Sequence, residues 1–431
     1  MRRDRLSLEN SHAVRFCRLF LMICAVMFFG CTVQWIVWLV SHSAGETVGW
    51  ISFRWLFFES GNDCFMDFFN SIRDAAQGLA AYTERHIIYP PLANFFYFLI
   101  AKAMPSWYVN TSFDDRGMAQ SHVPLLLLAI VVDVLFALTA LWLLRCLLKD
   151  RPAWERYLFL FVFVLSFPFL YLFERGNILL LTFVLVLIFL VFGDSPSRTR
   201  RELALLALAA AAALKLYPAI FALFLLRDKR YRELGRVILY FLLLSVLPTF
   251  FFGGPVPVFS ALLSNLFDFT QYKSTAEGGF SGSTPLTGCI SLLGGLFGFQ
   301  LSVPSDLKWV LVAVPVLAFI LCFFLSKTRF FSWLSLFGVL LSVPGVGSLY
   351  LLIFAFIPLF FFFQEEEELS HTVRALALVF FFLVLLPLPI GIRKNLSLSA
   401  MLSALLALPL VLFLCIFETV NRLRAYRKES L

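Results

Sequence analysis

Acidic side chains stand close together in the segment GNDCFMDFFNSIRD, residues 61–74. Asp67 and Asp74 are seven residues apart, so in a helix they share a face, with Asn70 between them. Asp63 precedes this stretch and is a candidate helix cap. A carboxylate held at a membrane surface can act as a general base for a hydroxyl group. The solvated face of a surface helix explains the same carboxylates equally well.

Two short polar stretches follow within apolar sequence. In ERHIIYPPLANFFYF, Tyr89 precedes two prolines, which fit the first turn of a new helix. In YLFERGNILLLTF the tetrad Glu174-Arg175-Gly176-Asn177 alone joins two apolar runs. A tight turn explains Gly176 and Asn177, and an internal ion pair explains Glu174 and Arg175. Arginine is also the best bidentate partner of a phosphate.

One lone cation and three later residues complete the candidates. Lys215 lies deep in the run AAAAALKLYPAIF, where it either snorkels to an interface or faces a lipid-linked phosphate. Tyr272 and Lys273 belong to a polar insert, residues 253–285, that is rich in Gly, Ser and Pro, and Tyr350 follows in VPGVGSLYLLIF. An insert of this size is unusual without a function, although its composition also fits a plain linker.

Membrane helices must position these residues. The chain has 431 residues, of which 61% are hydrophobic and only 14% charged, and no single soluble core could bury this much apolar surface. Apolar runs recur at about the 17–25 residues that a helix needs to cross the hydrocarbon layer. We therefore predict an all-α, polytopic transmembrane helical bundle with roughly 10–12 spans. The runs lie at approximately 16–40, 88–104, 122–145, 157–173, 177–193, 203–226, 237–252, 308–325, 331–343, 348–363, 373–391 and 398–420.

The distribution of charge orients the chain. Residues 1–18 carry five Arg against two acids, and the tail from Glu418 is also basic, whereas residues 41–88 carry six acids against three Arg. The positive-inside rule then places both ends in the cytoplasm and the 41–88 loop outside. Residues 65–82 of this loop have helical periodicity but are too polar to span, so we predict one interfacial helix there.

Three internal basic clusters, at 145–156, 198–201 and 227–236, also favour the cytoplasmic side. They cannot all lie there if every apolar run crosses once. We therefore expect one of the runs 88–104 and 203–226 to dip and return. Lys215 and Pro218 interrupt the second run and divide it into two short helices that can form a hairpin.

Domain organisation and partners follow from what the chain lacks. We see no internal repeat and no soluble domain, and predict a single transmembrane domain over residues 1–431. The net charge of +8 sits at span ends, so nucleic acid is not an expected partner, whereas membrane lipid is. The Cys and His spacing predicts no metal site and no cofactor, and leaves a need for a divalent metal open.

Taken in order, these stretches resemble the integral-membrane glycosyltransferases of the C-type superfamily, in particular the bacterial polyprenol-phosphate-mannose-dependent α-mannosyltransferase-like group. FMDFFNSIRDA is similar to the acidic surface helix of the first external loop, and YPPLANFFYF to the start of the second span. ERGNILLLTF resembles a Gly-Asn turn, LKLYPAIFALFLLRDKRYR a Lys-x-x-Pro helix end, and VPGVGSLYLLIFAFIPL a late Pro/Tyr span. The likeness covers most of residues 15–365 in spacing, although the late span lacks a clear polar triad.

The resemblance implies transfer of a sugar, with mannose as one candidate, from a polyprenyl-phosphate donor to a hydroxyl group of a glycolipid or glycan acceptor. It implies Asp67 as the general base, with Asp63 and Asp74 as alternatives. Lys215 and Arg175 would bind the donor phosphate. The substrate-orienting residues would be Tyr89, Asn177, Glu174, Tyr272, Lys273 and Tyr350. No nucleotide-binding signature such as GxGxxG stands out, in keeping with a lipid-linked donor.

The implied location is the plasma (inner) membrane, with several passes and the active site on the extracytoplasmic face. Two other classes stay open. A glycan polymerase or ligase would share the lipid-phosphate chemistry and have a large external loop late in the chain. A flippase or transporter of lipid-linked sugars would have pseudo-symmetric halves and charges along a path at mid-membrane.

Overall fold

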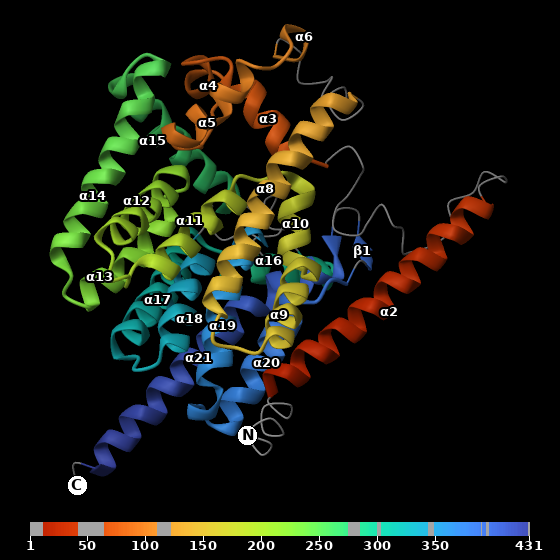
Figure 1. The fold of residues 1–431 in the computed structure, drawn as a ribbon, viewed down its shortest axis with the longest axis vertical. Helices are drawn as coiled ribbons and strands as arrows, with labels where there is room; N and C mark the ends of the chain where they lie inside the picture. Colours follow the sequence, from red (N-terminus) through yellow and green to blue (C-terminus); the bar gives the residue numbers. More distant parts are fainter. Residues whose placement is uncertain are drawn as a thin grey trace. The chain divides into compact units, whose positions relative to one another are not determined.

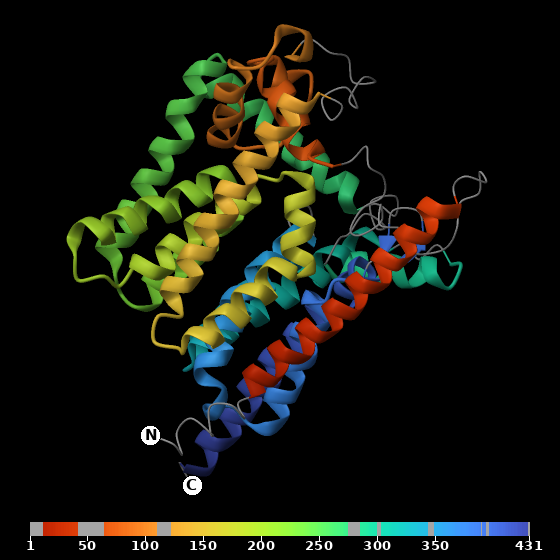
Figure 2. The ribbon, with the colours of Figure 1, turned by 45° about the vertical axis from the view of Figure 1, so that its right-hand side comes forward.

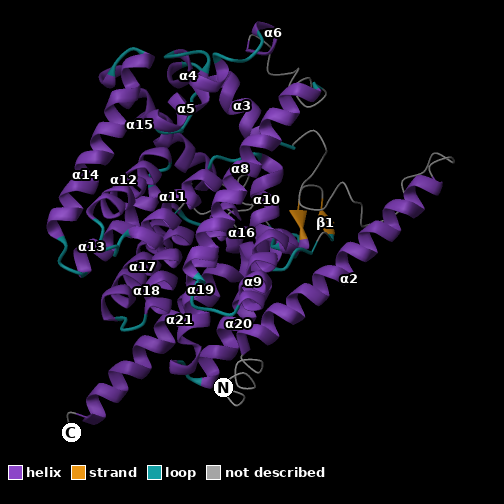
Figure 3. Ribbon diagram, in the orientation of Figure 1, coloured by secondary structure: helices purple, strands orange, loops and turns teal. Residues whose placement is uncertain are grey.

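The computed structural model describes residues 12–41, 64–109, 122–274, 285–299, 303–343, 349–388, 390–393 and 396–429. These residues are almost entirely helical, and the strand pair that they contain, β1 (Gly391–Arg393) with β2 (Leu396–Ser397), is short and antiparallel (Figure 3). Six of the described helices are long and apolar enough to cross a membrane, or up to seven with the bent pair α9 (Ala153–Leu165) and α10 (Phe167–Arg175). The predicted all-α, polytopic bundle is confirmed.

The number of full-length spans differs from the predicted 10–12, because several apolar runs contain helices of only 10–17 residues. The run 88–104 is an example. Its helix α5 (Pro91–Ala101) has 11 residues and measures about 17 Å, little more than half of the hydrocarbon thickness. It begins at the proline pair, as predicted, and is too short for a full span.

Contacts divide the chain into two compact units. Unit 1 comprises residues 1–60, 151–171 and 272–431, and unit 2 comprises residues 61–150 and 172–271. The prediction of one domain over the whole chain stays a prediction.

Unit 1 has a core dominated by phenylalanine. Every residue of α18 after Arg329 is buried, and its Trp333 ring stacks with Phe361 of α19. Gly338 lies so close to the Phe319 ring of α17 that a Cβ there would meet its Cε1 at 2.4 Å. The helices of this unit are α2 (His12–Ser41), α9, most of α10, α16 (Leu286–Leu296), α17 (Ser305–Leu325), α18 (Arg329–Ser342), η8 (Leu349–Ala355), α19 (Phe356–Glu365), η9 (Glu366–Glu368), α20 (His371–Leu385) and α21 (Leu398–Glu429).

Unit 2 carries the candidate site. Its short helices α3 to α6 gather at one end, and the turn after α13 lies at the opposite end (Figures 1 and 2). Its elements are α3 (Met66–Ala75), α4 (Ala80–Thr83), α5, α6 (Ser106–Val109), α8 (Val123–Leu147), the end of α10, α11 (Leu179–Phe192), α12 (Arg198–Leu214), η5 (Tyr217–Ala222), α13 (Leu223–Arg227), α14 (Tyr231–Val246), η6 (Leu247–Phe252) and α15 (Pro255–Ser274), the last three residues of which fall in unit 1.

The predicted interfacial helix over 65–82 is two helices, so that prediction is wrong in its extent. α3 ends at Ala75, and a turn in which Gly78 has φ of 64° separates it from α4. The apolar face of α3 packs against α5, where the Phe68 ring contacts the Tyr97 ring edge-on at 6.2 Å between centroids. α3 therefore covers one end of unit 2.

The run 203–226 turns back at Lys215, as its sequence predicts. Lys215 is extended (φ −144°, ψ 124°) and ends α12, and the chain returns through η5 and α13. Arg201, in the first turn of α12, pairs with Glu233 of α14 at 3.4 Å. The two ends of the hairpin thus lie together, and its tip at Lys215 lies about 25 Å away along α12.

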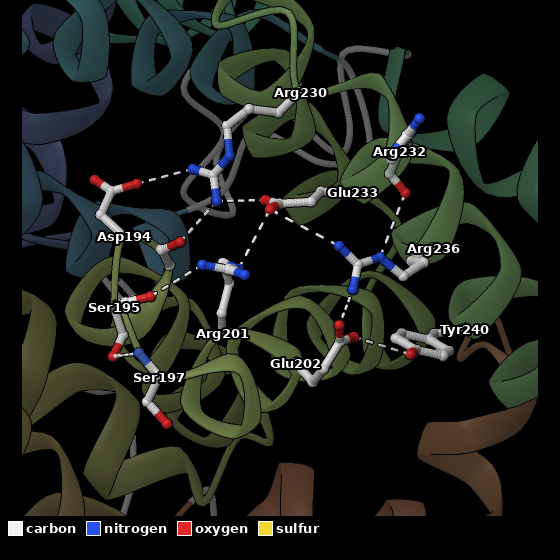
Figure 4. Close-up of polar contacts among 11 residues, drawn as sticks. Asp194, Ser195, Ser197, Arg201, Glu202, Arg230, Arg232, Glu233, Arg236 and Tyr240 are labelled. Carbon is white, nitrogen blue, oxygen red and sulfur yellow. Dashed lines mark hydrogen bonds and ion pairs between the residues drawn. The ribbon is translucent and has the colours of Figure 1, made fainter.

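An ion-pair network joins the ends of this hairpin, with Glu233 at its centre (Figure 4). Arg230 donates to Asp194 at 2.8 Å and also pairs with Glu233. Arg236 bridges Glu233 and Glu202. The basic clusters 198–201 and 227–236, which pose a conflict if the run crosses once, therefore share one side of the unit. We call the residues Asp194, Arg201, Glu202, Arg230, Glu233 and Arg236 the Glu233 network.

Most of the predicted polar insert 253–285 is helical, so its interpretation as a plain linker is wrong for residues 255–274. Asn265 of α15 is buried and donates to the backbone carbonyls of Tyr82 at 2.9 Å and Ile87 at 3.0 Å. α15 thereby fixes the segment between α4 and α5. Residues 275–284 lie outside the described residues.

Candidate functional site

The start of α3 packs directly on the Glu174–Asn177 turn. The Phe65 N–H donates to the Glu174 carbonyl at 2.6 Å, and Phe65 itself has φ of 56°. Gly176 has φ of 62°, and a Cβ at this position would lie 2.9 Å from Phe68 Cβ. Glycine is required here both by the left-handed backbone and by the close approach of α3. This junction brings Asp67, one residue into α3, to the turn.

Both carboxylate oxygens of Asp67 are bonded to this turn. Arg175 Nη2 donates to Oδ1 at 2.7 Å, and Asn177 Nδ2 donates to Oδ2 at 2.7 Å. Asn177 is only 5% exposed, and its Oδ1 accepts from the Leu179 N–H at 3.0 Å, which fixes the orientation of its amide. Asp67 and Arg175 are partly buried, at 15% and 19% side-chain exposure. Charge-assisted bonds of this kind are among the stronger polar contacts in proteins.

Tyr89 and Lys215 lie at the same end of unit 2. The Lys215 ammonium stands 3.9 Å from the centroid of the Tyr89 ring, well within the range of a cation–π contact. Lys215 also interacts electrostatically with Asp67. Five residues that the sequence separates by up to 148 positions therefore converge. We call Asp67, Tyr89, Arg175, Asn177 and Lys215 the Asp67 site.

The alternative bases have different surroundings. Asp74, on the same helix, pairs with the buried Arg73 at 3.6 Å. Burial raises the pKa of the Asp74 carboxyl, and the charges of Arg73 and Arg85 oppose this shift. Asp74 has no bond to the Glu174–Asn177 turn among those described. Asp63 lies outside the described residues.

The remaining candidates are not brought into the Asp67 site by a described contact. The Glu174 side chain accepts a hydrogen bond from the Cys64 thiol at 3.6 Å. The backbone carbonyl of Glu174 supports the junction by accepting from the Phe65 N–H. Tyr272 and Lys273 end α15, and their side chains lie outside the described part. Tyr350 belongs to unit 1, where its ring contacts the Tyr171 ring at 5.0 Å between centroids.

Two buried ionisable residues of unit 2, Arg73 and Asp133, are not among the candidates predicted from the sequence. Arg73 is buried beside Asp74 and bonds to Asn70, and its place at the end of an amphipathic stretch gives no sign of burial. Asp133 is 2% exposed on the buried face of α8. A signal for Asp133 exists, because it is the sole acidic residue in the apolar run 122–145, where charged residues usually have a function.

The arrangement suits displacement of an anionic leaving group by a hydroxyl. A carboxylate can take the hydroxyl proton, and two cations can neutralise charge that develops on a departing phosphate. Among the described residues, no group of three or more His, Cys, Asp or Glu side chains could hold a metal ion. The need for a divalent metal stays open.

Comparison with known proteins gives one match. The sequence matches glycosyltransferase family 87 over residues 88–344, more than half of the chain. The match includes Tyr89, Arg175, Asn177 and Lys215, and begins after Asp67. No curated protein and no solved structure matches the chain. With its apolar membrane-length helices, the chain belongs to glycosyltransferase family 87 and is a multi-pass membrane protein that transfers a sugar from a donor to an acceptor.

Proposed function

We propose that the protein transfers one sugar from a polyprenyl-phosphate donor to a hydroxyl group of a glycolipid or glycan acceptor. The observation that carries this proposal is the pairing of a carboxylate with cations at one end of unit 2. Asp67 bonds to Arg175 at 2.7 Å, and Lys215 interacts electrostatically with the same carboxylate. The polyprenyl chain would lie along the exposed apolar helix faces, which lipid covers.

In the proposed reaction, Asp67 accepts the proton of the acceptor hydroxyl while its oxygen attacks the anomeric carbon. The bond between that carbon and the phosphate oxygen breaks, and the electron pair leaves with the polyprenyl phosphate. Arg175 and Lys215 stabilise the negative charge on the departing phosphate. Asn177 holds the carboxylate in place through Oδ2, and Tyr89 holds the Lys215 ammonium.

The site is proposed to face the extracytoplasmic side of the plasma membrane. The support is the charge bias: the Glu233 network and the exposed Arg198 and Arg200 lie at the other end of α12 from Lys215. Cytoplasmic ends of spans carry the excess of Lys and Arg. Mannose remains one candidate among hexoses.

The test is a donor panel. Purified full-length protein is incubated with radiolabelled polyprenyl-phosphate hexoses, mannose included, and separately with nucleotide sugars, together with a membrane glycolipid extract. We expect label from at least one polyprenyl-phosphate sugar to enter a new glycolipid, and none from nucleotide sugars. Label that enters only from nucleotide sugars would refute the donor class. Transfer of a whole oligosaccharide would favour a polymerase or ligase.

A further inference from the structure

On the helices α5 and α8 of unit 2, three buried polar atoms have no hydrogen bond of normal length and angle among the described residues. They are Asn94 Nδ2 and Tyr97 Oη on α5, and Asp133 Oδ2 on α8. Tyr82 lies close to Asn94 and Ser71 lies close to Tyr97, whereas Asp133 has no such neighbour in the described part of the chain. The three residues are 2%, 1% and 2% exposed. Buried polar groups are almost always satisfied in folded proteins, so each needs an explanation. None of them has a part in the proposed proton transfer or phosphate binding. We call them the Tyr97 group.

The helices that carry these atoms pack side by side. The rings of Phe96 on α5 and Phe136 on α8 lie 6.4 Å apart between centroids. Tyr97 and Ala129 belong to one hydrophobic cluster, and Asp133 lies one turn beyond Ala129 on the buried face of α8. Asp133 also interacts electrostatically with Tyr97. Asn94 lies one turn before Tyr97 on α5, so the three residues face a common region.

This region adjoins the Asp67 site. The Tyr97 ring contacts the Tyr89 ring at 6.0 Å between centroids, and Tyr89 in turn carries the Lys215 ammonium at 3.9 Å. Tyr97 also interacts electrostatically with Asp67. Tyr89 thus connects Tyr97 to Lys215, the cation that is proposed to bind the donor phosphate. The Tyr97 group therefore lies next to the proposed position of that phosphate.

The chemistry of the three atoms fits hydroxyl groups. An amide N–H₂ donates, a carboxylate oxygen accepts, and a phenol hydroxyl does both. A sugar presents several hydroxyls, each of which donates and accepts. We propose that Asn94, Tyr97 and Asp133 form a subsite that binds hydroxyls of the sugar attached to the donor phosphate. This inference rests on the proposed function and names the part of the site that selects the sugar.

Tyr97→Phe is the variant of choice, because it removes one hydroxyl and keeps the ring that packs against Phe68, Tyr89 and Phe96. The probes are the polyprenyl-phosphate hexose with the highest turnover in the donor panel and its radiolabelled monodeoxy analogues. In the wild-type protein we expect at least one analogue to lose about tenfold or more in kcat/KM, since a site that binds a hydroxyl rejects substrates without it. In Tyr97→Phe that loss should fall below about threefold. Asp133→Asn gives a second test at the same or another hydroxyl.

Tyr240→Phe is the matched control, because the Tyr240 hydroxyl donates to Glu202 in the Glu233 network, away from the Tyr97 group. This variant should lose the same kcat/KM with each deoxy analogue as the wild-type protein does. Unchanged deoxy-sugar penalties in folded Tyr97→Phe and Asp133→Asn would overturn the subsite and leave water as its occupant. Equilibrium binding of the same radiolabelled analogues to detergent-purified protein separates the two proposals. If the wild-type protein binds the analogues with different affinities, Tyr97→Phe removes this difference, and no sugar is transferred, the subsite is retained and the proposed reaction is refuted. If no analogue binds, both proposals are refuted.

Discussion

At the level of single residues, the structure shows that Asp67 is held on both oxygens, by Arg175 and by Asn177. A base that is fixed in this way needs little reorganisation when a hydroxyl approaches, which is the usual benefit of a preorganised site. The same contact holds the Arg175 guanidinium beside the Asp67 carboxylate. The ion pair alone would also serve folding, so variants must separate the two roles.

Lys215→Ala tests the proposed phosphate cation. Loss of a charge-assisted bond of about 1.5–3 kcal/mol corresponds to a decrease of about 10- to 100-fold in kcat/KM for the donor. The acceptor KM should change little, because the ammonium is proposed to bind the donor phosphate and not the acceptor. Steady-state kinetics with each substrate varied in turn measures both.

Lys149→Ala is the control for that change, because Lys149 is exposed just after α8. Its donor kinetics should equal those of the wild type. If Lys215→Ala keeps the wild-type kcat and donor KM, Lys215 has no role in binding the phosphate.

At the level of elements, the sequence predicts the parts better than their junctions. The proline start of α5 and the break at Lys215 both follow from local rules, since proline fits the first turn of a helix and a lysine in an apolar run disfavours its continuation. The contact of α3 with Gly176 could not be predicted, because it depends on which face of α3 meets a turn more than a hundred residues away. The burial of Arg73 and Asp133 depends in the same way on tertiary packing.

Gly176→Ala tests this junction. The added Cβ would lie 2.9 Å from Phe68 Cβ on a backbone with φ of 62°. Left-handed strain costs about 1–2 kcal/mol, and the overpacking adds about 1–3 kcal/mol. We expect a lower unfolding temperature and lower sugar transfer, because α3 must move away from the turn and carry Asp67 with it.

Gly78→Ala separates strain from packing. Gly78 has φ of 64° and no neighbour within 4 Å of the position of a Cβ, so only the strain of about 1–2 kcal/mol should remain. Thermal unfolding and transfer assays on both variants make the comparison. Equal effects in the two variants would show that the approach of α3 to Gly176 is not critical.

At the level of the whole molecule, the described helices remove the conflict among the basic clusters. α5 is too short for a full span, so α8 is the one described helix of membrane-spanning length between Asp67 and the cluster after Arg145. Because the chain turns back at Lys215, the basic clusters 198–201 and 227–236 lie together on one side of the unit. Composition was sufficient to predict a helical membrane protein, whereas the number of full spans was not predictable, because apolar runs of similar length hold helices of very different length.

Cysteine labelling in intact cells tests the proposed orientation. Glu84→Cys, exposed after α4, should react with a membrane-impermeant maleimide from outside. Arg200→Cys, exposed at the start of α12, should react only after the membrane is permeabilised. The wild-type chain, with its eight native cysteines, gives the background. The reverse pattern would place the Asp67 site in the cytoplasm.

The central claim is that Asp67 removes the proton of the acceptor, and turnover of Asp67→Asn with a polyprenyl-phosphate donor tests it most directly. Asparagine keeps the shape and cannot act as a base, so we expect transfer to fall by about 10²- to 10⁴-fold in folded protein. Asp268→Asn, an exposed aspartate of α15, should retain wild-type transfer. Wild-type turnover in Asp67→Asn, or a comparable loss in Asp74→Asn alone, would contradict the account.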